Sequence, residues 1–290
     1  MSFALLAGLV AAAVRVAMSI ALAAIGETVT QRSGVLNVGI EGIMLVGAFL
    51  GAYGAAMSGS PWLGLLLAIA GGTALAAVHG FFSITLRVDQ VVSGIALILL
   101  GLGLSGFLFR ITLGREPTPI PAFAPVLFGQ TALVYIAIAI ALIVAFLLRR
   151  SALGLSIRAC GENPDAAHAA GVPVNRIRYG CVLFGGAMAG FGGAYLSLAQ
   201  VNAFVENMVV GRGFIAIACV VFARWNPVGA VAVALCFGFA EAAQIRLQSY
   251  YPDVPYQFFV MAPYLVAVVA LAFLARSAAL PRALGRRFAG

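Results

Sequence analysis

The sequence predicts an all-α integral membrane protein, with about nine transmembrane helices (roughly eight to ten) forming one domain over residues 1–290. Hydrophobic residues make up 63% of the chain and charged residues only 9%, and the mean hydropathy is +1.08. A soluble domain is about 45–50% apolar and about 25% charged, so only a bilayer can solvate this much apolar surface. The 34 glycines would let helices approach closely; Gly47 with Gly51 and Gly186 with Gly190 have the spacing of such contacts.

Apolar segments of spanning length follow one another along the chain. A transmembrane helix needs about 20 apolar residues, and about 17–25 are tolerated. The predicted segments lie near residues 3–25, 34–57, 62–86, 91–112, 131–148, 179–200, 212–224, 228–247 and 257–275. The segment at 212–224 is short and is interpreted as a half-helix or a re-entrant element. Arg15 lies inside the first apolar run, which is the wrong order for a cleavable signal peptide, so that run is assigned to the mature protein.

Arginines predict which connections lie in the cytoplasm. All 17 basic residues are arginines, scattered between apolar segments, so the formal charge of +8 does not indicate nucleic-acid binding. The hydrophilic loop at about 149–178 holds five of them and the tail 276–287 holds four. Both are therefore predicted to be cytoplasmic, with the carboxyl end inside and the amino end outside. The outward connections are then 58–61, 114–130, 201–211 and 249–256.

The first polar stretch, residues 26–42, reads GETVTQRSGVLNVGIEG. A carboxylate at the centre of a membrane helix costs roughly 2.5–3.5 kcal/mol, so Glu41 needs a partner or a wet cavity. Asn37 lies one helical turn before it, and the nearby glycines permit irregular backbone where it lines protein or water. Asn37 and Glu41 are thus candidates for the wall of a translocation path. The alternative is a helix end at the cytoplasmic interface, with Glu27, Arg32 and Glu41 solvated or paired.

A second polar stretch, AQVNAFVENMVVGRG at 199–213, concentrates donors and acceptors at the outer ends of two spans. Transporters use broken helices and helix amino termini to meet polar solutes. Alternatively, the stretch is an ordinary polar outer loop. The candidate solute contacts from this stretch and the residue after it are Asn202, Glu206, Asn207, Arg212 and Phe214.

The third stretch predicts a short helix within the cytoplasmic loop. Asn163 is a good N-cap, Pro164 suits the first helical position, Asp165 complements the positive helix end, and Gly171 ends the helix. So short a helix is not stable alone in water, so it must be held against something. We expect it to dock on a cytoplasmic partner; the alternative is an interfacial packing helix. The candidate docking residues are Glu162, Asn163, Pro164, Asp165, Ala166, His168 and Gly171.

No grouping in the sequence indicates catalysis. The four cysteines have neither metal-site nor disulfide spacing, and His79 has no clustered partners, so a packed core histidine is expected there. Glu241, Gln244 and Arg246 are expected to pair with one another; the alternative is that Glu241 faces a translocation path. The sequence contains no phosphate-binding loop and no catalytic triad motif. The chain is therefore predicted to be no enzyme, and any ATP that drives it must be hydrolysed by another polypeptide.

Three stretches make the chain similar to a known family. GETVTQRSGVLNVGIEG at 26–42, RACGENPDAA at 158–167, and GRGFIAIA at 211–218 with WNPVG at 225–229 resemble the permease subunits of bacterial ABC importers for branched-chain amino acids, ribose and nucleosides. The GVLNVGIEG form is similar to the nucleoside branch, whose permeases work with BmpA-like nucleoside-binding lipoproteins. The resemblance covers nearly the whole chain.

What the resemblance implies is a permease of the bacterial inner membrane that imports nucleosides or related sugar-like solutes by alternating access. Its partners would be a second permease (a paralogue or another copy), two cytoplasmic ABC ATPases or one fused ATPase, and an extracytoplasmic solute-binding lipoprotein. ATP–Mg would bind the ATPase, and this chain would hold no cofactor or metal. The helix from Glu162 would be the coupling helix that docks on the ATPase. The rival interpretation is a stand-alone secondary transporter or facilitator of a small polar solute, with Glu41 and Glu206 as ion sites.

Overall fold

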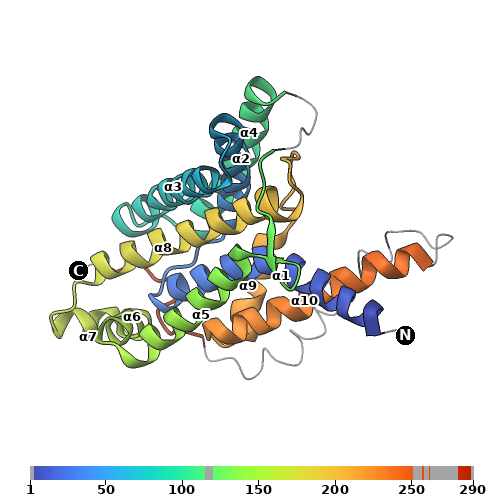
Figure 1. The fold of residues 1–290 in the computed structure, drawn as a ribbon. Coiled ribbons are helices and arrows are strands. Elements are labelled where there is room, and N and C mark those ends of the chain that lie inside the picture. Colours follow the sequence, from blue (N-terminus) through green and yellow to red (C-terminus); the bar gives the residue numbers. More distant parts are fainter. Residues whose placement is uncertain (1–2, 115–119, 251–256, 258–260, 262–279, 289–290) are drawn as a thin grey trace.

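The computed structural model describes residues 3–114, 120–250, 257, 261 and 280–288, which are helical almost throughout (Figure 1). The helices are α1 (Phe3–Arg32), α2 (Ile40–Ser58), α3 (Pro61–Gly80), α4 (Gln90–Thr112), α5 (Ala132–Arg150), α6 (Ala152–Glu162), α7 (Pro164–Ala169), α8 (Val174–Tyr195), α9 (Arg212–Phe222) and α10 (Pro227–Tyr250). Short π-helical segments, η1 (Phe81–Thr85) and η2 (Leu196–Gln200), extend α3 and α8. The antiparallel strands β1 (Pro125–Leu127) and β2 (Gln130–Thr131) form a small hairpin at the end of the predicted outward connection 114–130.

The membrane-spanning character predicted from composition is confirmed. Within the described residues, seven helices are long and apolar enough to cross a membrane. The helix α9 has only 11 residues, which at the α-helical rise is about 16 Å, or about half of a hydrocarbon core. It is the half-helix expected from the short segment at 212–224. The predicted span 257–275 lies almost wholly outside the described residues.

The bundle is built around α8, which packs between α3 on one side and α1 on the other and also contacts α2 (Figure 1). Glycines lie at these crossings. A Cβ atom added at Gly47 would lie 2.7 Å from the Cα of Gly190, and one added at Gly72 would lie 2.8 Å from it. The small-residue spacing noted in the sequence therefore marks places where two backbones touch.

The connections between helices gather at two ends of the bundle. At the arginine-rich end, the Nε of Arg32 donates to the carbonyl of Trp225 (3.2 Å), and the amide of Gly285 donates to the carbonyl of Gly34 (3.1 Å). At the opposite end, the amide of Ile120 donates to the carbonyl of Asn202 (3.2 Å). Connections that the sequence assigns to one side of the membrane thus lie together. Which end faces the cytoplasm stays a prediction.

The structure differs from the sequence prediction at one helix boundary and in one additional helix. The first helix continues through the polar residues to Arg32, a turn occupies 33–39, and α2 begins only at Ile40. Gly34 has φ +91 and begins that turn. The helix tolerates polar residues because they bond inside the fold; the hydroxyl of Thr30 donates to the carbonyl of Cys181 (3.1 Å). The second difference is α6, which the sequence analysis did not predict and which begins at the N-cap Ser151.

Candidate functional site: a re-entrant element and a capped surface helix

Residues 201–222, here called the re-entrant element, fold back into the bundle. The ring of Phe204 is 1% exposed and packs against Phe49 of α2 and Phe109 of α4, with centroid distances of 5.6 and 5.0 Å. Asn207 and Gly211 have φ values of +58 and +81, which turn the chain toward α9. The aromatic packing of Phe204 therefore holds the connection 201–211 against α2 and α4. Its placement on the outer side of the membrane stays a prediction.

Glu41 caps α9 from a different helix. Its Oε1 accepts from the amide of Gly211 (2.6 Å) and its Oε2 from the amide of Gly213 (2.7 Å), and the residue is only 7% exposed. The first turn of a helix leaves amides unsatisfied and carries a partial positive charge, and Gly211 has no side chain to satisfy them. The carboxylate of α2 supplies both acceptors. Glu41 is therefore buried and bonded to the protein itself.

The next residues of α9 depend on the same contact. A Cβ atom added at Gly213 would lie 2.7 Å from Oε2 of Glu41, so only glycine fits there. The Nη2 of Arg212 bonds Oε1 of Glu241 in α10 at 2.7 Å. The sequence analysis expected Glu241 to pair with neighbours on its own helix, whereas its partner here comes from α9. Phe214, one residue further, is exposed.

The far end of α9 is held by the end of α1. The buried indole Nε1 of Trp225 donates to Oε1 of Gln31 (2.8 Å), and Nε2 of Gln31 donates to Oε1 of Glu27 (3.0 Å). The guanidinium of Arg32 donates to the carbonyls of Trp225 and Arg224. The segments 26–42 and 211–229 thus pack together and are joined by side-chain hydrogen bonds at both ends of α9. The sequence analysis missed Gln31 and Trp225, although both lie in the motifs that carry the resemblance.

The predicted path residues fall into two groups. Asn37 is fully buried. Its backbone amide donates to Oε1 of Glu27 (3.1 Å), whereas its side chain has no hydrogen-bond partner in the described part of the chain. Together with Glu41 it lies inside the protomer. On the re-entrant element, by contrast, Asn202, Glu206, Asn207 and Phe214 are exposed, and Arg212 is half-buried. Contact of either group with a solute stays a prediction.

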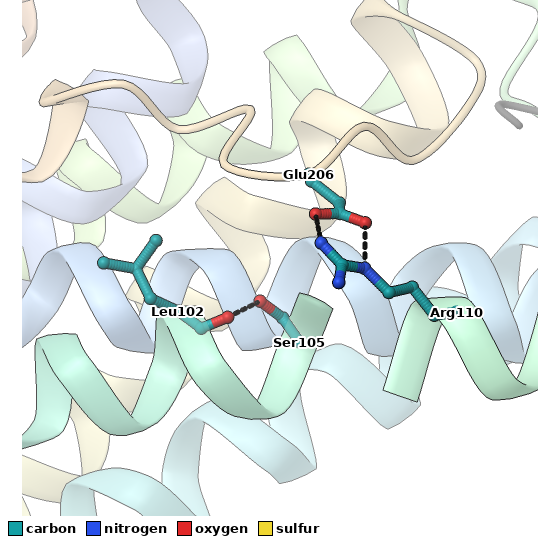
Figure 2. Close-up of polar contacts among 4 residues, drawn as sticks. All are labelled: Leu102, Ser105, Arg110 and Glu206. Atoms are coloured by element: carbon teal, nitrogen blue, oxygen red, sulfur yellow. Dashed lines mark hydrogen bonds and ion pairs between the residues drawn. The ribbon is translucent and has the colours of Figure 1, made fainter. Parts of the chain in front are cut away.

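An ion pair joins the re-entrant element to α4. Figure 2 shows the fork of Arg110 facing both carboxylate oxygens of Glu206, at 2.8 Å each. The side chains are 59% and 39% exposed, and Arg110 holds the pKa of Glu206 below its ordinary value. Ser105, on the same helix, donates to the carbonyl of Leu102 (3.4 Å). The re-entrant element is thus bonded to two other helices, by the exposed ion pair of Glu206 with Arg110 and by the buried hydrogen bonds to Glu41.

The capped surface helix predicted from the sequence is confirmed as α7. Oδ1 of Asn163 accepts from the amide of Ala166 (3.0 Å), and Pro164 occupies the first helical turn. Pro164 and Ala167 are buried, whereas Asp165 and Ala166 face outward. The outward face also includes Glu162, Asn163, His168 and Gly171. The helix is therefore held by one side and presents the other.

Arg178 of α8 joins three segments that lie around α7. This arginine is 2% exposed, and its guanidinium donates to the carbonyls of Ser33 (3.2 Å), Arg286 (3.3 Å) and Cys160 (3.5 Å). It thereby joins the end of α1, the end of α6 and the tail segment 280–288. From the sequence alone, Arg178 is only a topology signal. Burial raises the pKa of the neighbouring Cys160 thiol.

A groove of about 520 Å³ separates α7 from the tail segment. The amide of Ala283 donates to the carbonyl of Gly161 (2.8 Å), which holds the tail beside the helix. The groove is lined by Glu162, Asn163, Pro164, Asp165, Arg282, Ala283, Arg286 and Arg287. Acidic and basic side chains thus share one polar surface next to the outward face of α7.

Replacing Arg178 with alanine is expected to lower the free energy of unfolding by about 2–3 kcal/mol, since three carbonyls lose a charged donor at a buried position. Limited proteolysis would detect the release of the tail, with faster cleavage after Arg282. Arg176→Ala, at an exposed arginine two residues earlier in α8, is the control and should behave as the unmodified chain. Equal cleavage rates in the two variants would contradict the role given to Arg178.

Several known proteins are similar to this chain in sequence. The profile of a family described as branched-chain amino acid transport system / permease component matches residues 9–275. A putative glucose ABC transporter permease protein of Haloferax volcanii is 45% identical over 265 residues, covering 86% of this chain and 80% of the relative. The guanosine permease protein NupQ of Bacillus subtilis is 35% identical, covering 91% of each chain. The nucleoside permease protein NupC of Lactococcus lactis is 34% identical, covering 90% of each.

Proposed function

The chain belongs to the permease family of branched-chain amino acid transport systems and is an ABC transporter permease component; we propose that it imports a nucleoside or a related sugar-like solute by alternating access. The relatives named above are permeases for guanosine, nucleosides and, putatively, glucose, all solutes with a hydroxylated ring. The GVLNVGIEG form at 34–42 supports the nucleoside class.

The observation that carries the mechanism is the exposed face of α7. An ATPase needs a helix that is fixed to the permease, and the cap and the buried face of α7 fix it to the bundle. We place the ATPase on the face formed by Asp165, Ala166 and His168, with the α7–tail groove beside it. This arrangement puts the arginine-rich end in the cytoplasm.

The path is proposed to run along the exposed side of the re-entrant element. Asn202, Glu206, Asn207 and Phe214 project from it, and Arg110 pairs with Glu206 at its outer end. A second permease, a paralogue or another copy, would face this side. Because Glu41 and Trp225 tie both ends of α9 to the α1–α2 turn, movement of that turn would move α9 as one body. An extracytoplasmic binding protein would deliver the solute to the opposite end from α7.

A lysine on the docking face should uncouple the transporter. Ala166→Lys is expected to lower solute-stimulated ATP hydrolysis at least about tenfold in the reconstituted complex, because a long charged side chain displaces the ATPase from α7. The matched control is Ala152→Lys, the same substitution at an exposed position in the first turn of α6, which should retain coupling.

Reversing both charges beside the cap, with Glu162→Lys and Asp165→Lys, should have the same effect while leaving membrane insertion intact. Retained coupling in the Ala166→Lys and double-lysine variants would refute the docking role of α7. Solute uptake by the purified chain in liposomes, driven by a proton gradient without ATP, would refute ATP-driven import and favour a stand-alone transporter.

A further inference from the structure

A second cluster of arginines lies at the same end, and two of its members, Arg149 and Arg158, have no role in the mechanism above. Arg32 of α1, Arg149 of α5 and Arg158 of α6 line one cavity of about 180 Å³, here called the basic pocket. Its other walls are Ala145, Leu148, Trp225, Asn226 and Pro227. Three positive side chains from three helices thus converge on a space that is distinct from the α7–tail groove.

The chain compensates the charges in the basic pocket only at a distance. Glu162 is the attracting neighbour of Arg32, whereas Arg158 and Arg149 repel it. Among the described residues, no carboxylate lies within ion-pair distance of these three guanidinium groups. Arg32 and Arg158 each use Nε on a backbone carbonyl, which fixes their orientation. An arrangement of held, like-charged groups favours binding of an anion.

The position of the pocket indicates what kind of anion it meets. Arg149 directly follows the apolar run of α5, so the pocket lies where a spanning helix leaves the bilayer. Beside it, Leu147 and Leu153 are 40% and 53% exposed, and Leu155 is 61% exposed. On the other side of Leu148 lies an apolar cavity of about 270 Å³, between α1, α5, α6 and α8. Apolar surface next to a basic pocket suits an amphiphile.

A polar atom of one wall residue favours a hydroxylated head group. Oδ1 of Asn226 is buried and has no hydrogen-bond partner in the described structure. A buried acceptor of this kind is stabilised by a donor, and a phosphate alone at neutral pH offers few. The hydroxyl groups of a glycerol head group would supply one.

From this geometry we infer that the basic pocket binds the phosphate of an anionic phospholipid, of the phosphatidylglycerol type, from the leaflet at this end of the bundle. Arg149 and Arg158 contact the phosphate, Asn226 accepts from the head group, and an acyl chain lies on the leucines of α5 and α6. Since Arg32 and Trp225 also line the pocket, the lipid bridges α6, which leads to α7, and the far end of α9. This inference does not depend on an ATPase or on the transported solute.

The test is a lipid titration of the purified full-length chain in neutral detergent, read as the midpoint of thermal unfolding. Dioleoyl phosphatidylglycerol is expected to raise the midpoint by about 3 °C or more, because a ligand that binds only the folded state stabilises it. Dioleoyl phosphatidylcholine should leave it unchanged. Inorganic phosphate should also leave the midpoint unchanged, and this result would distinguish binding of a lipid head group from binding of a free anion.

The decisive variant is Arg149→Ala with Arg158→Ala, which should bind phosphatidylglycerol at least about tenfold more weakly through loss of charged hydrogen bonds. Its matched control is Arg282→Ala with Arg287→Ala, two exposed arginines at the same end that line the other groove. If the lipid bound only by non-specific attraction to positive charge, both double variants would weaken its binding equally. If the alanine pair is too unstable to measure, Arg149→Glu alone, at an exposed position, serves the same purpose.

Three results would overturn the inference. The first is an undiminished response to phosphatidylglycerol in the Arg149/Arg158 variant. The second is an equal loss in the Arg282/Arg287 control. The third is a shift with inorganic phosphate as large as that with the lipid, which would make the pocket a site for a soluble anion.

Discussion

Gly193→Val is expected to be the most destabilising single change in the bundle, lowering the free energy of unfolding by about 3 kcal/mol or more. A Cβ atom at Gly193 of α8 would overlap the carbonyl oxygen of Met44 in α2 and lie 2.7 Å from the amide nitrogen of Ala48. These are backbone atoms of a neighbouring helix, so no rotamer change relieves the overlap and the two helices must separate. Denaturant unfolding in detergent would measure the loss.

The same helix provides the control for Gly193. A Cβ atom added at Gly180 meets nothing within 4 Å. Gly180→Ala should therefore be neutral or stabilise the protein by up to about 1 kcal/mol, as alanine does in place of glycine within a helix. A Gly193→Val variant that unfolds at the midpoint of the unmodified chain would show that α2 and α8 are not in contact as described.

Removal of the Glu41 carboxylate should release the re-entrant element. Glu41→Ala deletes two short charged hydrogen bonds to the amides of Gly211 and Gly213, and the expected loss is about 3 kcal/mol. Because this stabilisation is local, hydrogen exchange is the sharpest measurement. The amides of Gly211 and Gly213 should exchange about 100-fold faster, since about 1.4 kcal/mol corresponds to a factor of ten.

Two further variants test the capping role of Glu41. Glu41→Gln keeps one good acceptor and should fall between Glu41→Ala and the unmodified chain. Glu206→Ala removes a carboxylate from the exposed end of the same element, where ion pairs add little to stability. It should leave the exchange of Gly211 and Gly213 unchanged. Equal exchange rates of these amides in Glu41→Ala and the unmodified chain would contradict the proposed capping of α9 by Glu41.

Several features could be predicted from the sequence because each depends on residues close together in the chain. The spans follow from runs of apolar side chains, and α7 follows from Asn163, Pro164 and Asp165, whose capping needs only neighbouring atoms. The short length of α9 likewise indicated a half-helix. The helix α6 was missed, since its 11 residues are too few for a membrane span and the loop around it is rich in arginine.

The roles of the buried polar residues could not be predicted, because their partners are far away in the sequence. Glu41 bonds amides that lie 170 and 172 residues further on, and Trp225 lies 194 residues from Gln31. A carboxylate before an apolar run has the same local signal whether it faces a path, water or another helix. The expectation that Glu241 would pair with its sequence neighbours was wrong for this reason.

By itself, then, the sequence determined that the chain lies in a membrane, where its helices run, and that one short helix is capped and exposed. These features depend on composition and on hydrogen bonds between residues that are close together in the sequence. Only the tertiary structure decided that the polar motifs at 26–42 and 211–229 hold a half-helix at both ends, and that arginines of three helices share one pocket. Both depend on side chains that only the packing of the bundle brings within hydrogen-bonding or electrostatic reach.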